Sequence, residues 1–506
     1  MHKGTDNSTY KKLVTELKRL HHLNSSLSLL GWDEQVNLPK GSAERRAQQS
    51  AVLADIVHRE FTQPQIGEWL DNLESLTNGL SDQNLAVIRE VRRNYDRAVK
   101  LPAEFVARKA VLDSQAYHAW ADARAKINFS LFAPLLKQQV ECSIEEACYL
   151  GYDRKNTYDF HIDKHDPALN TVIINDLFDK LKKDLIPLVR NILDSSIKAD
   201  TSIFKGFPIN LQESFLREVT TTIGFDYNRG RIDRALHPFC GGDGSDTRMT
   251  TRYDTNNPLD SLYSSIHETG HGLYEQGLPL EHLGTALGEA VGMAMHESQS
   301  RLWENQVGRS KAFWNYWKVK YRSLFSQQLA GISDNQFYLA VNEVALNPIR
   351  VNSDEVTYNL HIILRFELEK RLIAGELEVE DLPSEWNRLS IDIIGMKPKN
   401  DNEGVLQDIH WSSGSFGYFP SYCLGNMLAA QFWYAALKEL PDLEKDFRMG
   451  DFSKLLHWLR KKVHRHGKQY DTLTLTKIVT GDELSPKCLI TYLKERYLPL
   501  YLEPQT

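Results

Sequence analysis

Residues 257–277 read NPLDSLYSSIHETGHGLYEQG, and this stretch decides the fold. Asn257 is suited to precede a helix, Pro258 to begin it and Gly277 to follow it. Between them, apolar residues recur every three or four positions, as on the buried face of an amphipathic helix. The stretch therefore predicts a helix that packs against a large core.

A metal-binding pattern lies inside this helix, in the segment His267-Glu268-Thr269-Gly270-His271. Four residues are close to one helical turn, so both imidazoles project from one face and can bind one metal ion. Glu268 lies next to that face, where it would contact a water molecule on the metal. Gly270 suits a place where another segment approaches closely. The pattern indicates a zinc hydrolase, and two ordinary histidines on a helix are the alternative.

A third ligand is needed, because catalytic zinc usually has three protein ligands and one open position. The following helix, expected over residues 285–307, contains His296-Glu297-Ser298-Gln299. Glu297 comes far enough after His271 for the first helix to end and the chain to return antiparallel. We therefore expect Glu297 to complete the site, with His296 as the second choice and a surface glutamate as the alternative.

The composition is that of an ordinary globular protein. The chain has 506 residues, of which 42% are hydrophobic and 25% charged, enough for a large core. It carries 60 Lys+Arg against 67 Asp+Glu, a formal net charge of −7, which disfavours a nucleic-acid-binding protein. The basic residues at 460–468 lie among apolar residues, as they would on the solvated face of an amphipathic helix.

The cysteines and the uncharged segments indicate a cytoplasmic protein. Five scattered cysteines form no C-x-x-C pair, so neither a disulfide framework nor a cysteine zinc site is expected. The N-terminus lacks the apolar centre of a signal peptide. The longest uncharged stretch, residues 411–437, contains Pro420 and several glycines, and we interpret it as a buried loop and helix rather than a membrane span.

Helical spacing dominates the rest of the chain. Apolar positions three and four residues apart predict helices over 8–30, 42–60, 82–99, 103–127, 130–150 and 169–198. Residues 231–256 differ, because two short extended pieces surround a turn rich in glycine and aspartate. We expect a mostly α fold with a small β-hairpin or sheet beside the helix that carries the metal-binding pattern.

Six motifs occur in a fixed order along the chain. They are HPF (237–239), DTRMT (246–250), HETGH (267–271), HESQ (296–299), IRVNSD (349–354) and GVLQDIHW (404–411). By these motifs the chain resembles the carboxypeptidase Taq family of metallocarboxypeptidases. Weaker matches at 31–33 and 497–500 extend the resemblance over essentially the whole chain. The departures are slight: Met249 stands where isoleucine is common, and Ser353 takes the position of a small residue.

The resemblance implies a zinc-dependent exopeptidase that releases single C-terminal amino acids from peptides, with broad specificity and with proline disfavoured. It also implies a homodimer and a gluzincin-like helical fold with two lobes around a deep active-site groove. We treat 1–506 as one catalytic unit, with 1–200 as a mainly helical N-terminal lobe or lid and 201–506 as the metal-site and substrate-binding region. Co²⁺ or Mn²⁺ could occupy a zinc site of this kind, and neither a nucleic-acid nor a membrane partner is expected.

The chemistry assigns a role to each candidate residue of the metal site. Zn²⁺ would be held by His267, His271 and Glu297, while Glu268 would take a proton from the attacking water and pass it to the leaving amine. The oxyanion that forms needs a further stabilising group. His410 and Tyr422 are the candidates, because both lie in the stretch that the resemblance places at the site; packed aromatic side chains are the alternative.

Recognition of a free carboxylate calls for a fixed cation. Arg350 is the first candidate, because it precedes a helix that we expect to begin with Ser353 as its N-cap; a structural ion pair with an acidic residue is the alternative. Arg248 is the second candidate, although it could instead pair with Asp246. His237 is expected either to contact the substrate or to have a structural role.

Two rival functions remain at this stage. An endopeptidase or oligopeptidase of similar helical fold would share the metal site but would not need to bind a free carboxylate. A catalytically inactive helical binding protein would be expected to lack Glu268, which is present. Comparing a free-acid peptide with its C-terminal amide would separate the first rival from a carboxypeptidase.

Overall fold

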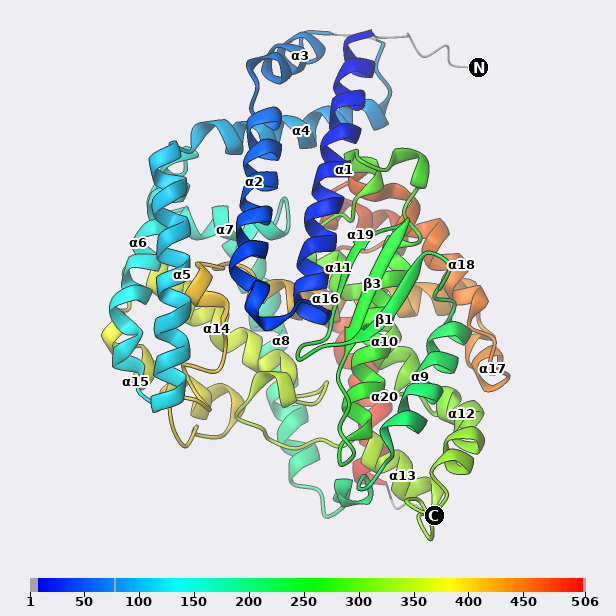
Figure 1. The fold of residues 1–506 in the computed structure, drawn as a ribbon. Helices are drawn as coiled ribbons and strands as arrows, with labels where there is room; N and C mark the ends of the chain where they lie inside the picture. The colour runs from blue at the N-terminus through cyan, green and yellow to red at the C-terminus, as the bar shows by residue number, and fades with distance from the viewer. Residues whose placement is uncertain (1–7, 77–78, 504–506) are drawn as a thin grey trace. The chain divides into compact units, whose positions relative to one another are not determined.

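The computed structural model describes residues 8–76 and 79–503 of the chain, and Figure 1 shows its ribbon. Helices make up most of these residues, with one small sheet of three strands. The mostly α fold predicted from the apolar spacing is therefore confirmed.

The chain divides into two units, and each unit gathers three separate segments. Unit 1 comprises Met1–Val99, Ser202–Ser333 and Phe432–Asp482. Unit 2 comprises Lys100–Thr201, Asp334–Gln431 and Glu483–Thr506. The predicted regions, 1–200 and 201–506, are each continuous in sequence, unlike these units. Their assignment as a lid region and a metal-site region stays a prediction. The predicted groove concerns how two lobes are arranged, and it also stays a prediction.

Unit 1 contains the sheet and the helix with the metal-binding pattern. Its α-helices are α1 (Ser8–Val36), α2 (Ala43–Phe61), α3 (Pro64–Glu74), α4 (Asp82–Lys100), α9 (Ile209–Ile223), α10 (Pro258–Glu275), α11 (Met293–Arg301), α12 (Lys311–Leu324), α17 (Leu443–Arg448), α18 (Ser453–Lys462) and α19 (Thr472–Thr480). A π-helical segment, η6 (Leu302–Gly308), continues α11 directly.

Unit 2 contains helices and loops but no strand among its described residues. Its α-helices are α5 (Ala103–Lys126), α6 (Ala133–Tyr149), α7 (Thr157–His165), α8 (Thr171–Leu193), α13 (Asp334–Val341), α14 (Tyr358–Ala374), α15 (Leu382–Leu389), α20 (Lys487–Leu502) and the first part of α16 (Phe419–Glu439). The chain passes into unit 1 within α16.

Each of the six helices predicted from apolar spacing is present, with shifted ends. The predicted helix 8–30 runs on to Val36 as α1, and the predicted helix 169–198 already ends at Leu193 as α8. Neither α3 nor α7 was predicted. On α7, the polar Thr157 and His161 are almost completely buried, so the apolar spacing that marks a helix is missing there.

The sheet has the strand order β1-β3-β2, with β1 at Gly230–Arg234, β2 at Phe239–Asp243 and β3 at Asp246–Thr251. The predicted hairpin is present, because β2 and β3 pair antiparallel. The sequence missed β1, which pairs parallel with β3, and it placed Gly242 in the turn rather than in β2. Gly242 has a φ of +99°, and a Cβ there would lie 1.9 Å from the Asp246 carbonyl oxygen. Only glycine fits this position of the strand.

The two faces of the sheet contact different helices of unit 1. Thr247 and Thr251, both fully buried, face α10: Thr251 Oγ1 lies 3.0 Å from Ser264 Oγ. Side chains alternate along a strand, so Arg248 points to the opposite face. There its guanidinium lies 4.3 Å from the ring centre of Trp32 on α1. The sheet is therefore packed between α10 and α1.

Gly270 allows α10 and α11 to pack closely. A Cβ on Gly270 would lie 2.5 Å from Ser300 Cα and 2.6 Å from the Gln299 carbonyl oxygen, both backbone atoms of α11. The predicted close approach at this glycine is confirmed. The predicted helix 285–307 is in fact shorter at its start, since α11 begins at Met293, and it widens into η6 after Arg301.

The segment before α14 corrects a prediction. Ser353 does not cap the helix, because α14 begins only at Tyr358. Asp354 caps the preceding turn instead: its Oδ1 accepts hydrogen bonds from the backbone N–H groups of Val356 and Thr357, at 2.9 and 3.0 Å. The far end of α14 is closed by Gly375, which has a φ of +73°.

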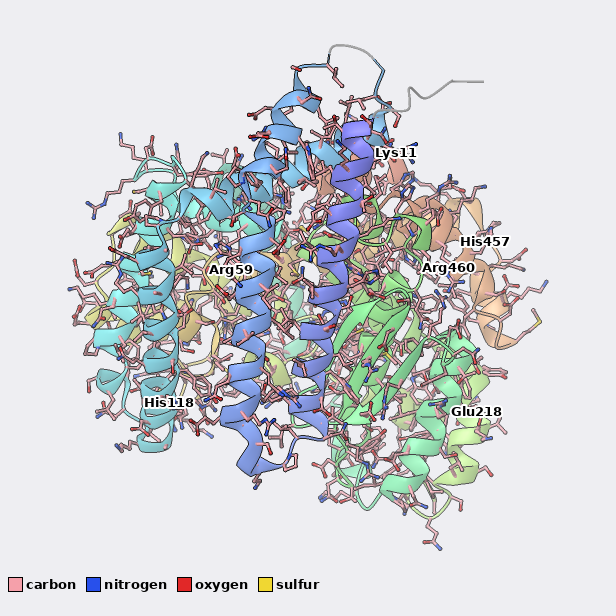
Figure 2. All side chains as sticks on the ribbon, turned by 45° about the horizontal axis from the view of Figure 1, so that its top comes forward. Lys11, Arg59, His118, Glu218, His457 and Arg460 are labelled. Atoms are coloured by element: carbon pink, nitrogen blue, oxygen red, sulfur yellow. The ribbon has the colours of Figure 1, made fainter. Side chains whose placement is uncertain are left out.

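Charged side chains cover the outer faces of the peripheral helices. Lys11 on α1 and Arg59 on α2 extend into solvent, and so does His457 on α18 (Figure 2). On α18, Leu455 and Leu459 are buried while Lys461 is exposed, as expected for a solvated basic face. Arg460 is only partly exposed, and α18 ends at Lys462, so the rest of the basic run lies beyond this helix. None of the described helices is long and apolar enough to cross a membrane.

Replacing Gly270 by alanine should lower the melting temperature, because the new methyl group would overlap the backbone of α11. Overpacking of this kind costs about 1–3 kcal/mol. The matched control is Gly31→Ala on α1, where no atom lies within 4 Å of the added Cβ. That change should stabilise the protein by about 0.4–1 kcal/mol. Thermal unfolding followed by circular dichroism measures both, and an unchanged melting temperature for Gly270→Ala would contradict the close crossing.

Candidate active site

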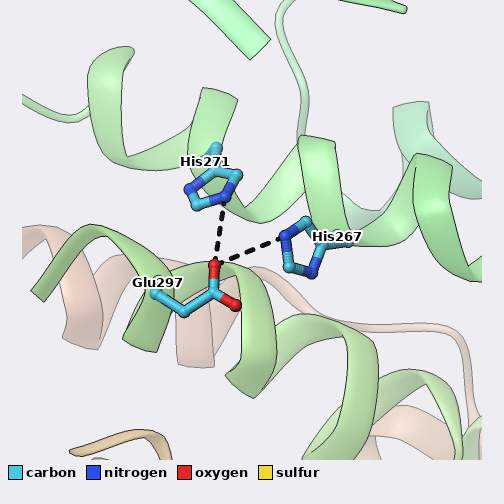
Figure 3. Close-up of side chains that lie close together, drawn as sticks. All are labelled: His267, His271 and Glu297. Atoms are coloured by element: carbon cyan, nitrogen blue, oxygen red, sulfur yellow. Dashed lines mark ion pairs between the residues drawn. The ribbon is translucent and has the colours of Figure 1, made fainter. Parts of the chain in front are cut away.

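Three potential metal ligands come together between α10 and α11. The Nε2 atoms of His267 and His271 each lie 3.4 Å from Glu297 Oε2, and Figure 3 shows both imidazoles directed at that oxygen. One donor atom from each residue lies within 4.8 Å of the other two. Two imidazole nitrogens and one carboxylate oxygen are thus placed around a common point.

The Glu297 carboxylate is held by its own helix. Glu297 is 5% exposed, and Arg301, one turn later, donates from Nε to Oε1 at 2.7 Å. Ser300 Oγ donates to Oε2 at 3.0 Å. Because Oε1 is taken by the guanidinium, Oε2 is the oxygen available to a metal ion.

His267 is oriented by a carboxylate that the sequence analysis missed. Its Nδ1 lies 2.8 Å from Glu304 Oε2, which Arg301 also contacts at 3.1 Å. A hydrogen bond at Nδ1 leaves Nε2 of a neutral imidazole free to bind a metal. Glu304 belongs to η6, and apolar spacing gives no sign of the wider turn of a π-helix.

His296, the second choice for the third ligand, lies behind His271 instead. The two Nδ1 atoms are 2.5 Å apart, and His296 Nε2 lies 2.8 Å from Glu275 Oε1. One consistent set of tautomers has His271 donating from Nδ1 to His296 and His296 donating to Glu275. In that arrangement His271 presents a bare Nε2 to the metal position.

Burial and charge set the protonation of this cluster. Burial raises the pKa of Glu268 to about 7. Burial lowers the pKa of His271 to about 3, with the neighbouring His296 adding to the effect. Burial also opposes the charged form of His267, but Glu297 and Glu304 outweigh it and raise the pKa of His267 to about 10. The two histidines differ because only His267 has a second carboxylate beside it.

Cys240 on β2 lies near this cluster, because the charges of Glu268 and Glu275 both act on its thiol. Burial, together with the charges of Glu268 and Glu275, raises the pKa of its thiol well above the usual range. The thiolate is the reactive form of cysteine. Cys240 is therefore not an activated nucleophile.

Unit 2 contains a second cluster, built around Arg350. The guanidinium donates to Asp408 Oδ1 from Nε at 3.0 Å and from Nη2 at 2.9 Å, and from Nη1 to Tyr358 at 2.9 Å. Arg365 donates to the other carboxylate oxygen of Asp408 at 2.6 Å. Arg350 is 6% exposed and Arg365 is fully buried. The acidic partner of Arg350 is thus Asp408.

His410 and Tyr422 lie in the same cluster as Arg350. Their Nε2 and hydroxyl atoms are 3.5 Å apart, at the long limit of a hydrogen bond, and the Arg350 guanidinium lies 5.1 Å from the Tyr422 ring centre. Burial lowers the pKa of His410 to about 4, so its imidazole is neutral at neutral pH. The structure therefore brings together three of the predicted residues that sequence motifs alone had linked.

Arg248 and His237 are placed differently. Arg248 donates to both oxygens of Asp246 at 2.9 Å, on the sheet face away from α10. This is the ion pair given above as the alternative to a substrate role. His237 is exposed on the loop before β2, and its carbonyl oxygen accepts a hydrogen bond from Thr250 Oγ1. Neither placement favours direct contact with the residues around His267.

The model of the carboxypeptidase Taq (M32) metallopeptidases matches residues 12–497. The chain belongs to the carboxypeptidase Taq (M32) family. It is 39% identical to thermostable carboxypeptidase 1 of Thermus thermophilus over 510 residues, covering 98% of this chain and 100% of that protein. It is 38% identical to carboxypeptidase 1 of Bacillus subtilis over 497 residues, covering 98% and 99%. The crystal structure of the M32 carboxypeptidase from Deinococcus radiodurans matches with a TM-score of 0.95 at 38% identity, covering 98% and 100%.

Membership of the carboxypeptidase Taq family makes the chain a metallocarboxypeptidase and implies a divalent metal. The donor atoms in unit 1 fit such an ion. Two imidazoles with hydrogen bonds at Nδ1, and one carboxylate oxygen, form the two-histidine, one-glutamate set that suits catalytic zinc. Glu268 follows His267 directly and has no hydrogen-bond partner among the described residues.

Replacing Asp408 by asparagine should destabilise this carboxypeptidase strongly. It would leave the buried guanidinium groups of Arg350 and Arg365 facing a neutral amide, and removing one partner of a buried ion pair costs about 3–5 kcal/mol. Asp392→Asn is the control, because the pair of Asp392 with Arg388 is 54% exposed on both sides and is worth about 0–1 kcal/mol. Urea unfolding at neutral pH measures both.

The effect of Asp408→Asn should also depend on pH. Burial opposes ionisation of Asp408, but Arg365 and Arg350 outweigh it and hold its pKa well below the usual range. Its ionised form therefore stabilises the fold above about pH 4, and this contribution is lost as the pH falls further. The difference in stability between the parent and the variant should shrink below that pH. A constant difference would show that the charge of Asp408 is not the cause.

Proposed function

We propose that the chain releases single C-terminal amino acids from peptides by attack of water at a zinc site formed by His267, His271 and Glu297. The observation that carries the proposal is the convergence of three donor atoms, each already oriented by a neighbouring side chain. Zinc bound there would act as a Lewis acid that polarises the scissile carbonyl and makes water more acidic. Co²⁺ and Mn²⁺ are the alternatives at this site.

Glu268 is proposed to move the protons. Its carboxylate follows a metal ligand in sequence and is almost completely buried. It would take a proton from the attacking water and deliver it to the leaving amine. A carboxylate that transfers protons must be free of competing hydrogen bonds. No described side chain donates a hydrogen bond to Glu268.

His410 and Tyr422 are proposed to stabilise the oxyanion. Both can donate a hydrogen bond, since burial keeps the His410 imidazole neutral with one N–H group and Tyr422 has its hydroxyl. Preorganised donors of this kind stabilise the negative charge that develops in the transition state.

Arg350 is proposed to bind the free carboxylate of the peptide. Asp408 and Tyr358 hold its guanidinium in one orientation, and a fixed planar guanidinium suits bidentate binding of a carboxylate. Arg248 and His237 remain weaker candidates for contact with the substrate.

Several finer features complete the proposal. The disfavour for proline and the homodimer rest on the family resemblance, and the cytoplasmic location rests on the five free cysteines. The family match favours a carboxypeptidase over the endopeptidase or oligopeptidase alternative, which would not need Arg350.

Replacing Glu268 by glutamine should keep the metal and the fold but lower kcat by about 10²–10⁴-fold, because the proton carrier is lost. Glu275→Gln is the matched change on the same helix. It removes the partner of His296, so it should weaken metal binding by about 10–100-fold while leaving kcat at saturating zinc nearly unchanged. Metal content and zinc affinity are measured beside peptide hydrolysis. A metal-loaded Glu268→Gln variant with normal turnover would show that another group is the base.

Replacing Arg350 by alanine should reduce kcat/KM for free-acid peptides by an amount equivalent to about 2–5 kcal/mol, with lysine restoring only part. Peptides with a C-terminal amide should be poor substrates of the parent enzyme and should change little. Arg365→Ala is the control: it also loses the contact with Asp408, but this side chain is fully buried and cannot reach a peptide.

The comparison of these two variants separates binding from stability. If both lower kcat/KM equally for free acids, the effect comes from Asp408 and not from recognition of the carboxylate. If the parent enzyme cleaves amidated peptides internally as fast as free acids, it is an endopeptidase.

A further inference from the structure

Glu369 on α14 is a fully buried carboxylate with three hydrogen-bond donors. Its Oε1 accepts from Trp411 Nε1 at 2.7 Å. Its Oε2 accepts from the Tyr158 hydroxyl at 2.8 Å and from the backbone N–H of Gly417 at 3.0 Å. Two of the three donors belong to the segment 410–417, which begins with His410. All of these residues lie in unit 2.

The chain just before this segment is also bound to α14, one helical turn away. Arg365 precedes Glu369 by four residues, so the two side chains leave the same face of the helix. Arg365 binds Asp408, while Glu369 binds Trp411 and Gly417. The helix α14 therefore holds the chain on both sides of His410. Arg365 binds the residue two positions before it, and Glu369 binds residues that follow it.

The backbone of this segment is closely fitted to its surroundings. Gly417 has a φ of +75°, and a Cβ there would lie 2.4 Å from the carbonyl carbon of His161. Gln139 Nε2 donates to the Ser412 carbonyl oxygen at 2.9 Å. These contacts restrict the path of the backbone at Ser412 and Gly417. The ring of His410 packs on Phe419 with the centroids 4.6 Å apart.

Burying the charged Glu369 carboxylate in this part of the core costs free energy, because the charge is removed from water. Burial raises the pKa of Glu369 to about 7, despite its three donors. An apolar side chain of similar size would avoid the cost of removing a charge from water. The ionic group gives what an apolar side chain cannot, namely directional bonds to an indole N–H and a backbone N–H of the same segment.

We propose that Glu369 is a positioning residue, which fixes the segment 410–417 and thereby the imidazole of His410 beside Tyr422. The inference rests on the proposed function in one respect, the role of His410 in stabilising the oxyanion. A misplacement of about 1 Å in a catalytic group can cost roughly 10²-fold in rate, so loss of these bonds should be visible in turnover.

The test compares Glu369→Gln with Trp411→Phe and with the double variant. Glutamine keeps the size of the side chain but can no longer accept from all three donors. Phenylalanine removes the indole N–H together with part of the buried ring. Each single change should lower kcat by about 10-fold or more, with KM and zinc content nearly unchanged. Because both changes remove the hydrogen bond between Trp411 and Glu369, their effects on kcat should be less than additive in the double variant. Trp411→Phe leaves the Glu369 carboxylate in place. If Glu369→Gln folds poorly, the kcat of Trp411→Phe therefore still tests the inference.

Glu146→Gln provides the matched control. Glu146 is another buried glutamate of unit 2, on α6, and its partner is Lys164 rather than the segment 410–417. It should change melting temperature without changing kcat. An effect on kcat as large as that of Glu369→Gln would mean that any buried charge in this unit matters, and it would overturn the inference.

NMR separates the inference from the proposed function. The indole signal of Trp411 and the imidazole signals of His410 should both shift in Glu369→Gln and stay in place in Glu146→Gln. Unshifted signals would overturn the positioning role, whatever the activity. If His410→Ala keeps the parent kcat, the proposed role of His410 fails, and the NMR signals alone then decide whether Glu369 fixes the segment. Normal kcat in Glu369→Gln, with His410→Ala inactive, would overturn the inference and leave the proposed function intact.

Discussion

The close crossing of α10 and α11 at Gly270 is the constraint on which the candidate metal site depends. The two imidazoles come from one helix and the carboxylate from the other, so the distance between the helix axes sets the distance between the donor atoms. A side chain at position 270 would separate the helices by the width of a methyl group, since backbone atoms of α11 already lie within van der Waals range of its Cβ position. Arg301 then fixes the direction of the Glu297 carboxylate, which a long flexible side chain would not keep by itself.

Much of this arrangement could be predicted from the sequence, for identifiable reasons. Helical geometry places residues four apart on one face, so the sequence alone predicts that His267 and His271 can bind one metal ion. Glu297 followed from the need for a returning helix. The orienting groups could not be predicted, because Glu304 depends on a π-helical turn and His296 depends on which ring nitrogen faces its neighbour. Neither property leaves a trace in residue spacing.

The same limit applies to the fold and to unit 2. The hairpin was visible in a cluster of glycines, but β1 was not, because its pairing with β3 joins segments that are separated in sequence. Sequence reasoning placed Arg350, His410 and Tyr422 in one site by their motifs. It did not identify Asp408 as the carboxylate that joins Arg350 to Arg365, although Asp408 is part of one of those motifs. A buried ion pair needs three-dimensional proximity, and charge alone does not identify its members.

The division of unit 1 into three chain segments has a consequence for how the protein is made. The last segment, Phe432–Asp482, supplies His464, whose Nε2 lies 3.0 Å from Gln299 on the helix that carries Glu297. A ribosome adds about 5–20 residues per second, so the first two segments wait on the order of ten seconds for this partner. During that time α11 lacks part of its buried surroundings. The packing around Glu297 is therefore complete only after nearly the whole chain has been synthesised.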